Sequence, residues 1–475
     1  MMSTRNDPRW TPSRRSWRRP LVLLAVAGLT VAACGDEDDT AGGATTEAPA
    51  GTGAATTEAP ADTGAATTEA PAHTGAATTE APADTGAATT EAPADTSTEG
   101  TGEAPSGDPI KVMTVTTLNA AGPTYENIAN TANAYAEYIN ARGGIAGRPL
   151  EVTVCDEQFD PAVATTCARQ AVDEGMVSVV GSFTFFAESI VPVIAESSIT
   201  WFGACCPITP SELTSPYSFN IGNQPMYAVG AVKKAVDDGC ENINAVIIDG
   251  AQIFIPPMKN AMANLGKTFG DVIILPPTAQ DYSAEVAQAT TGADCVISII
   301  SETPFITWNT AWAQSGTDAQ QYGPQGNLNE ISAAGNEEAT NGNIIVGMYP
   351  DISTEPWTEY RTALDEAGLD LTENDYNSLG GMGTWAAYVA FTQIAETIEG
   401  DITAESFYDA ASTTSNLDLN GMVPVLDFTQ EWTDGLEGYQ RLFNRSVVYS
   451  QLEDGKVVPL TTEFEDVGDL ALPPG

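Results

Sequence analysis

The sequence predicts an α/β protein built on parallel sheets, and its first folded stretch shows why. Ile110, Val112 and Val115 mark a short apolar run typical of a buried strand. A helix with its apolar positions on one face follows and ends at Gly143, and a second strand begins at Leu150. A helix between two such strands is the βαβ unit of a parallel sheet.

The remainder of residues 108–475 repeats this alternation and is too long for a single sheet of ordinary size. Further strands are expected at residues 177–181, 200–203, 245–249, 272–275, 295–300 and 344–348. Helices are expected between them, among others at residues 187–196, 226–237, 305–314 and 378–396. Ligands of open α/β sheets bind beyond the carboxyl ends of the strands, which makes residues 116–125 the first candidate part of a binding site.

Residues 1–34 are expected to be a processing signal rather than part of the fold. An arginine-rich head precedes an apolar run at residues 21–33, which is too short to span a bilayer as a helix. The small residues before Cys34 resemble the lipobox of a bacterial lipoprotein signal, and this resemblance implies that Cys34 becomes the lipidated N-terminus. An ordinary secretory signal is the alternative, and Ser13-Arg14-Arg15 leaves a twin-arginine route open.

Residues 35–107 are expected to form a disordered, solvated tether. The sequence Thr-Thr-Glu-Ala-Pro-Ala begins at Thr45 and recurs four more times with an eleven-residue period, and no repeat offers an apolar face to bury. Fully extended, such a tether would reach ~200 Å, and as a coil about 45 Å. Six of the 18 basic residues and one of the 64 acidic residues precede Cys34, which leaves 12 basic and 63 acidic residues. This negative charge excludes nucleic acid and anionic lipid headgroups as partners.

The composition argues against an enzyme. The only histidine is His73, in the tether, so the folded part has neither a Ser-His-Asp nor a Cys-His arrangement, nor a histidine-ligated zinc site. It also lacks a P-loop and a Gly-x-Gly-x-x-Gly sequence after the first strand, and the glycines at 380–383 are interpreted as a packed helix start. We interpret Asp156 and Glu157 as solvated loop residues, and we predict no catalytic residue, cofactor or metal.

Six cysteines follow Cys34, and cysteine use of this kind fits an exported protein. They allow fifteen pairings, between which the sequence cannot choose. A short Cys155–Cys167 bridge would join the second strand to the next helix, while Cys240 and Cys295 share one half of the chain. Cys205 and Cys206 could form a strained vicinal disulfide or stay as free or cross-paired thiols.

The folded part resembles a known family. Residues 139–150, with their Asn-x-x-Gly-Gly-Ile-x-Gly run, together with Asp156 and Asp160-Pro161, resemble the leucine/isoleucine/valine-binding type of periplasmic binding protein (type I). The resemblance extends through residues 209–213 and 323–326 and covers residues 108–464 loosely. It implies two Rossmann-like lobes, 108–222 with 350–425 and 223–349 with 426–475. Three hinge crossings near 219–223, 347–351 and 424–427 would join them.

The resemblance also implies where ligand is held. Tyr125 matches a tyrosine that lines the cleft, and the segment around Ser182 stands where the family holds a ligand carboxylate with a hydroxyl and backbone N–H groups. Gln325 stands where amino-acid binders place an acidic residue, and a neutral amide cannot pair a buried cation as a carboxylate does, so Asp249 or Glu302 would take that role. The predicted ligand-binding set is Thr117, Tyr125, Ser182, Phe183, Thr184, Cys205, Cys206, Thr209, Asp249, Phe254, Glu302 and Gln325.

We therefore expect a monomeric, lipid-anchored solute-binding protein on the extracytoplasmic face of the cell membrane. It would deliver an amino acid, an amide or a small carboxylate to an ABC importer permease, and Phe183, Phe185, Phe186 and Phe254 add apolar surface near the cleft or pack in the core. The alternatives are a ligand-sensing module for a membrane receptor and, with less support, a cell-envelope enzyme. A co-purified permease would separate transport from sensing.

Overall fold

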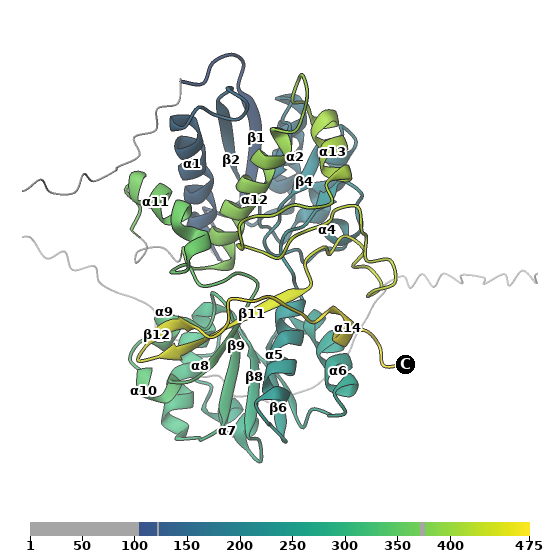
Figure 1. The fold of residues 1–475 in the computed structure, drawn as a ribbon. Coiled ribbons are helices and arrows are strands. Elements are labelled where there is room, and N and C mark those ends of the chain that lie inside the picture. Colours follow the sequence, from purple (N-terminus) through teal and green to yellow (C-terminus); the bar gives the residue numbers. More distant parts are fainter. Residues whose placement is uncertain (1–103, 121–122, 371–375) are drawn as a thin grey trace, which may run out of the picture. The chain divides into compact units, whose positions relative to one another are not determined.

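The computed structural model describes residues 104–120, 123–370 and 376–475. The predicted signal segment, Cys34 and nearly all of the predicted tether lie outside the described residues. No helix within the described ranges is long and apolar enough to cross a membrane. The predicted α/β fold with two lobes is confirmed, and each lobe is built around its own sheet (Figure 1).

The first lobe contains a five-stranded parallel sheet with the order β2-β1-β3-β4-β5. Its strands are β1 (Ile110–Thr116), β2 (Leu150–Asp156), β3 (Ser178–Val180), β4 (Thr200–Phe202) and β5 (Ser218–Phe219). Its helices are α1 (Glu126–Ala141), α2 (Pro161–Asp173), η1 (Ala187–Ser189), α3 (Val191–Ala195), α4 (Pro210–Thr214), η3 (Glu355–Trp357), α11 (Thr358–Glu366), α12 (Leu379–Ala395) and α13 (Ala404–Thr413).

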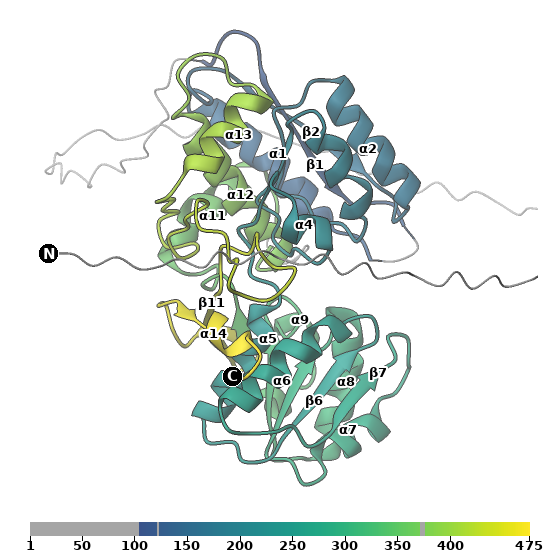
Figure 2. The same ribbon diagram turned by 90° about the vertical axis from the view of Figure 1, so that its right-hand side faces the viewer.

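Alternation along β1 explains how helices cover both faces of this sheet. Ile110 and Val112 belong to the core formed with α1 and α12, whereas Met113 and Val115 belong to the core formed with α2 and α3 (Figures 1 and 2). The helix predicted at 187–196 is instead broken into η1 and α3. Pro192 lacks an N–H group and fits only in the first turn of a helix, so the α-helix starts there.

The second lobe contains an eight-stranded mixed sheet with the order β12-β11-β10-β9-β8-β6-β7, and β13 pairs with β11. Its parallel strands are β6 (Ile243–Ile248), β7 (Val272–Leu275), β8 (Cys295–Ile299), β9 (Gln320–Pro324) and β10 (Ile344–Gly347). Its antiparallel strands are β11 (Ser446–Glu453), β12 (Lys456–Pro459) and β13 (Glu465–Asp466). Its helices are α5 (Met226–Asp237), η2 (Gln252–Phe254), α6 (Ile255–Asn264), α7 (Ser283–Thr290), α8 (Glu302–Ser315), α9 (Glu330–Ala333), α10 (Glu337–Thr340) and α14 (Gly468–Ala471).

Three chain segments join the two lobes. The first runs from the end of β5 to α5, and the second from the end of β10 to η3, where the sequence placed them. The third crossing was expected at 424–427, but this placement is wrong. Phe428 packs on Phe202 and Phe219 of the first lobe, and the chain enters the second sheet only at Ser446. Residues 426–443 therefore belong with the first lobe.

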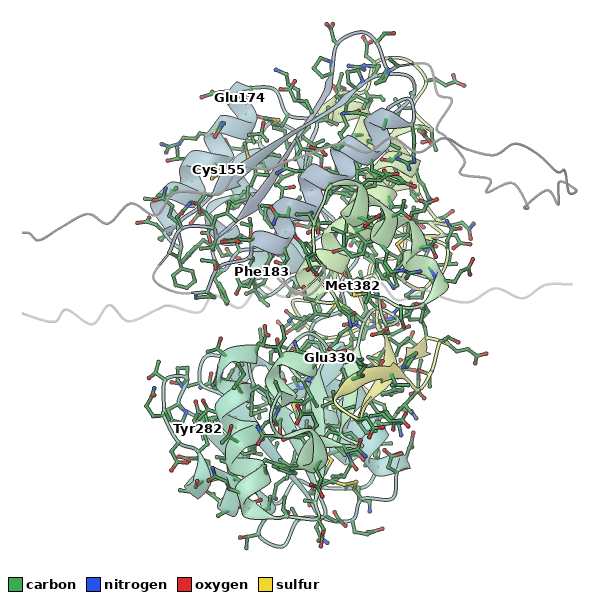
Figure 3. All side chains as sticks on the ribbon, turned by 90° about the vertical axis from the view of Figure 1, so that its left-hand side faces the viewer. Cys155, Glu174, Phe183, Tyr282, Glu330 and Met382 are labelled. Atoms are coloured by element: carbon green, nitrogen blue, oxygen red, sulfur yellow. A yellow bond between two sulfur atoms is a disulfide. The ribbon has the colours of Figure 1, made fainter. Side chains whose placement is uncertain are left out.

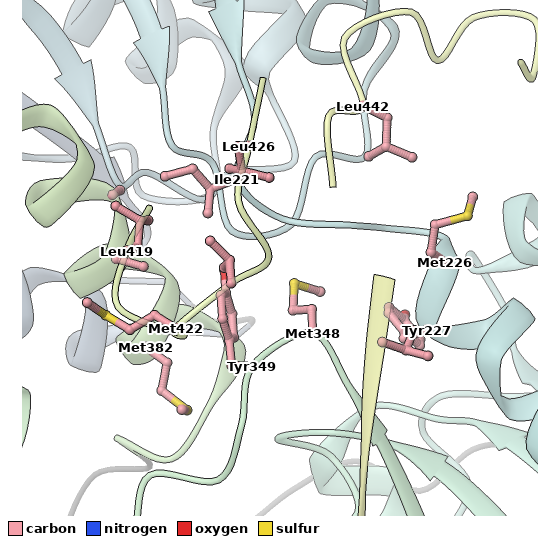
Figure 4. Close-up of a cluster of buried hydrophobic side chains, with 14 of the residues drawn as sticks. Ile221, Met226, Tyr227, Met348, Tyr349, Met382, Leu419, Met422, Leu426 and Leu442 are labelled. Carbon is pink, nitrogen blue, oxygen red and sulfur yellow. The ribbon is translucent and has the colours of Figure 1, made fainter. Parts of the chain in front are cut away.

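Buried polar and apolar groups fix the crossings to one another. Asn444 Nδ2 donates to the Ile221 carbonyl at 3.0 Å, and Asn220 Nδ2 donates to the Arg441 carbonyl at 3.0 Å. Side chains from all three crossings, among them Ile221, Tyr349 and Leu442, gather in the apolar cluster of Figure 4. Buried amide hydrogen bonds specify one arrangement of these backbones, because an unpaired partner would be costly.

The structure contains the short Cys155–Cys167 bridge that the sequence suggested, and it adds a second pair that the sequence left open. Cys155 on β2 is bonded to Cys167 on α2, and Cys240 is bonded to Cys295 at the start of β8. Figure 3 marks Cys155 on the first lobe. Cys205 and Cys206 are free thiols, so the vicinal disulfide left open by the sequence is not formed.

Candidate ligand-binding site

The carboxyl ends of β1 and β3 place the first group of predicted site residues side by side. Thr117 follows β1 directly, and Ser182, Phe183 and Thr184 follow β3. The Val115 N–H group donates to Ser182 Oγ at 2.9 Å, and the Phe183 N–H group donates to the Val115 carbonyl at 3.2 Å. These bonds pin the β3 loop to β1, and they leave the Ser182 hydroxyl proton available to another acceptor.

Glu157, directly after β2, is the residue that the sequence analysis misjudged. It was interpreted as a solvated loop residue, yet its side chain is completely buried. Thr117 Oγ1 donates to Glu157 Oε1, and the Thr184 hydroxyl also interacts with this carboxyl group. Burial raises the pKa of Glu157, the two hydroxyl groups lower it in part, and the charges of Asp156 and Asp160 raise it further. Its neighbour Asp156 is not a loop residue either: it is the last residue of β2, is half-buried, and accepts hydrogen bonds from the Leu118 and Gln158 N–H groups.

Aromatic rings extend from this group of residues towards solvent. Tyr125, at the start of α1, packs edge-on against Phe183 with 4.9 Å between ring centroids, and Phe183 packs on Phe185 at 5.3 Å. Phe185 in turn contacts Phe159, and these two rings are 42% and 40% exposed. Phe159 adopts a left-handed backbone conformation with φ of 55°, which is uncommon for a bulky residue. Figure 3 marks Phe183 on the first lobe.

The loop after β4 brings Cys205 and Cys206 to the same edge of the sheet. Both thiols are buried, and their Sγ atoms lie 2.8 Å apart. Burial raises the pKa of Cys206, and the hydrogen bond and charge of Cys205 raise it further. Burial likewise raises the pKa of Tyr125, with further contributions from Cys206, Cys205 and Glu157. Tyr125 therefore lies close enough to Glu157 and to both thiols for their charges to affect its pKa.

Thr209 occupies the next turn and serves the fold. Its N–H group and Oγ1 both donate to Glu212 Oε2 at 2.9 Å, which fixes the N-terminus of α4. Glu212 itself is buried and also accepts hydrogen bonds from Trp201 Nε1 at 3.1 Å and from the Ile208 N–H group at 3.0 Å. Burial raises the pKa of Glu212 to about 7, although these four hydrogen bonds act in the opposite direction.

The predicted residues of the second lobe are more dispersed. Asp249 is exposed and accepts from Gln252 Nε2, and Phe254 is buried against Tyr227. Glu302 begins α8 and is half-buried, and burial raises its pKa while a hydrogen bond with Asn329 lowers it in part.

The side chain of Gln325 is hydrogen-bonded to the backbone of the second crossing. Its Oε1 accepts from the Met348 and Tyr349 N–H groups, and its Nε2 donates to the Tyr349 carbonyl at 3.1 Å. Across the part of the chain that the structure describes, Gln325, Asp249 and Glu302 make no hydrogen bond or ring contact with the predicted residues of the first lobe. The structure thus brings together Thr117, Tyr125, the Ser182–Thr184 segment and the two thiols, and it adds Glu157. No local sequence signal marked Glu157, because its burial depends on residues from other loops.

Metal binding finds little support in the described ranges. The only cluster there with three potential ligand atoms in reach of one another is Cys240, Asp294 and Cys295. Its two cysteines are bonded to each other and offer no thiolate.

Comparison with known proteins identifies the family and the fold of the chain. A sequence profile of periplasmic binding proteins matches residues 109–435, while a search of curated proteins gave no match. Among solved structures, the chain is similar to a substrate-binding periplasmic protein from Ralstonia solanacearum, with a TM-score of 0.61 and 15% identity over 75% of this chain and 100% of that one.

Two further similar structures carry more specific titles. A fatty acid ABC transporter substrate-binding protein from Thermomonospora curvata has a TM-score of 0.60 and 17% identity, over 78% of this chain and 95% of its own. A leucine-binding protein from Thermotoga maritima has a TM-score of 0.58 and 14% identity, over 75% of this chain and 97% of its own. At such identities the likeness concerns the fold.

Proposed function

The chain belongs to the periplasmic binding protein family, a family of binding proteins rather than enzymes, and from this premise we propose that it captures a small organic solute and delivers it to an ABC importer. The solute is an amino acid, an amide or a small carboxylate. The single observation that supports this proposal most is the convergence of Thr117, Tyr125, Ser182, Thr184 and the two thiols at one edge of a parallel sheet.

The division into two lobes gives the proposal its mechanism. Ligand first contacts the strand ends of the first lobe, and residues of the second lobe such as Glu302 complete the site when the lobes close. Closure is favoured only by contacts that the open state lacks. The titles of similar structures, which name leucine and fatty acids, are compatible with a solute that has an apolar part.

The proposal includes the membrane anchor. Cys34 carries the lipid, and residues 35–107 give the binding domain reach from the extracytoplasmic face of the membrane. The chain acts as a monomer and meets the membrane through its lipid alone.

A thermal-shift screen of the full chain against amino acids, amides and small carboxylates tests the binding function. At a concentration one hundred times its Kd, a ligand stabilises the folded state by about 2.7 kcal/mol, so one hit should raise Tm by several degrees. Tyr125→Ala and Thr184→Val should abolish that shift. Thr165→Val is the matched control, because Thr165 Oγ1 bonds only within α2, to the Pro161 carbonyl. If both site variants bind as the parent does, the site lies elsewhere.

A further inference from the structure

The carboxyl group of Glu157 is held in an unusual way for a buried charge. Its side chain has 0% exposure, and Oε2 makes no hydrogen bond in the structure. It is the only carboxylate oxygen among the buried, unpartnered side-chain atoms of the described residues. The hydroxyl of Thr116, on the same sheet edge, is also buried without a partner. The Glu157 N–H group donates to the Thr116 carbonyl at 3.0 Å, so both residues lie at this end of the sheet. A buried carboxylate oxygen without a partner here indicates a site that a ligand completes.

The hydrogen bonds that Glu157 makes decide whether the neighbouring hydroxyl groups can act as donors or as acceptors. The Thr117 hydroxyl group donates its one proton to Glu157 Oε1, so it can act only as a hydrogen-bond acceptor towards any other group. The Thr184 hydroxyl accepts from the Phe186 N–H group at 3.0 Å and directs its proton towards the Glu157 carboxyl. Both hydroxyl groups therefore act as acceptors at this edge of the sheet.

No cation compensates the carboxylate. None of the ion pairs among the described residues includes Glu157, and the nearest charges are those of Asp156 and Asp160, which are also negative. A ligand carboxylate placed against Thr117 and Thr184 would meet acceptor oxygens and like charge, with the Ser182 hydroxyl proton as the one side-chain donor beside them. A ligand ammonium or amide N–H group would meet acceptors and, for the ammonium, an opposite charge.

We propose that Glu157 makes this sheet edge select a solute with a hydrogen-bond-donating head, an ammonium group before a neutral amide, and reject a free carboxylate. Glu157 does this in two ways: it orients the Thr117 and Thr184 hydroxyl groups, and its own unpaired Oε2 accepts a hydrogen bond from the solute. The inference rests on the proposed solute-binding function and narrows its solute class.

The neighbouring rings specify the rest of the solute. Tyr125, Phe183, Phe185 and Phe159 form a continuous row of edge-on contacts from the buried carboxylate to the exposed surface. Aromatic faces bind flat apolar groups and also attract cations. A ring or short apolar chain bearing an amine fits this sequence of surfaces better than a fully polar solute.

Three probes that share a ring and differ in their heads test the inference: 2-phenylethylamine, phenylacetamide and phenylacetate. Calorimetric titration of the full chain should give the tightest binding for the amine, weaker binding for the amide and none for the acid. Glu157→Gln should weaken amine binding at least tenfold and change amide binding less than threefold. A merely structural role would weaken both equally. Glu151→Gln, at the exposed start of the strand that Glu157 follows, removes the same charge and should change neither.

The outcomes separate this inference from the function on which it rests. Phenylacetate binding as tightly as the amine, or an unchanged amine affinity in Glu157→Gln, would overturn it. If the wider solute screen yields carboxylates alone, the selectivity is overturned and solute binding stands. If that screen yields no solute of any class, both fall. If the wider screen yields another amine and 2-phenylethylamine does not bind, that amine is used to compare the Glu157→Gln and Glu151→Gln variants.

Discussion

The loops that follow β2 and β4 each bury one glutamate in the first lobe, and they treat it in opposite ways. Glu212, beyond β4, receives four hydrogen bonds from Trp201, Ile208 and Thr209. Glu157, beyond β2, interacts with two hydroxyl groups and has an oxygen without a partner. A carboxylate whose oxygens are both satisfied by the protein supports the fold, whereas one left incomplete is available to a ligand.

The difference arises from the local chain. Glu212 lies at the third position of α4, where a carboxylate can reach back to the N–H groups that a helix start leaves free. Glu157 lies between a strand end and the Asp160 cap of α2. The Gln158 N–H group is bound by Asp156, and the first free N–H groups of α2, those of Ala162 and Val163, are bound by Asp160. The partners of the Glu157 carboxyl group are side-chain hydroxyl groups. The predictions below test this contrast, from the largest expected effect to the smallest.

Glu212→Ala should destabilise the fold most. It leaves the Trp201 indole N–H and the Ile208 and Thr209 N–H groups buried without an acceptor, and each such group costs about 1–3 kcal/mol. We expect a loss of about 4 kcal/mol in the free energy of unfolding, measured by urea denaturation. A loss below about 1 kcal/mol would show that the β4 loop does not depend on this carboxylate.

The raised pKa of Glu212 predicts a pH dependence of stability. The folded state binds this proton with a pKa of about 7, against 4.5 when the group is unperturbed. The folded state therefore holds the proton more tightly, and stability falls as pH rises from 4.5 to 7 and is constant with respect to this group above that range. The loss amounts to about 3 kcal/mol.

The Glu212→Gln variant isolates this contribution. Subtracting its unfolding free energies from those of the parent, over pH 4 to 8, removes the titration of all other groups. The difference should decrease with rising pH. A flat difference, or one that increases, would contradict the raised pKa.

Gly383→Ala should disturb the loop after β4, because α12 packs against Cys205 in this loop. A Cβ atom at Gly383 on α12 would lie 2.3 Å from Cys205 Cβ and 2.9 Å from the Tyr349 hydroxyl, so backbone or helix must shift. We expect a loss of about 2 kcal/mol in thermal or urea unfolding. Gly380→Ala in the same helix is the control, since its Cβ meets the flexible Ile128 side chain at 3.1 Å and alanine favours the helix. Equal losses in both variants would mean that helix packing alone, and not Cys205, sets the effect.

The sequence predicted the fold well where the signal is local. The spacing of apolar residues in β1, α1 and β2 is a property of neighbouring residues, and the structure forms these elements where they were expected. The glycines at 380–383 are likewise confirmed as a packed helix start within α12. By contrast, residues 414–445 contain no helix or strand, and only contacts of Phe428 and Arg441 with the distant β5 strand show that they belong to the first lobe.

The candidate site divides in the same way. Strand ends of a parallel sheet must meet at one edge, so Thr117, Ser182 and Cys205 could be grouped from the order of strands alone. The burial of Glu157 and the commitment of Gln325 to the Met348–Tyr349 backbone arise from packing between segments far apart in sequence. Residue type and position carry no information about such contacts, and for that reason the acidic Glu157 was interpreted as solvated.

Glu157→Gln should have the smallest effect on the free protein, and the comparison with Glu212→Gln is the sharpest test of the contrast between the two loops.

An amide has one acceptor oxygen. At position 212 its NH₂ group must face either the Trp201 indole or the donors of Ile208 and Thr209, which should cost about 2 kcal/mol at pH 5, where Glu212 with its pKa of about 7 is protonated and no buried charge is relieved. At position 157 the amide oxygen still accepts from Thr117, while the NH₂ group takes the place of an unpaired oxygen and a buried charge disappears. The unfolding free energy should change there by less than about 1 kcal/mol, because the lost hydrogen bond and the relieved desolvation nearly cancel. Urea titrations of both variants at pH 5 measure this difference directly. Equal losses of unfolding free energy in the two variants would mean that Glu157 supports the fold as Glu212 does. Its unpaired oxygen would then not be a ligand-binding group.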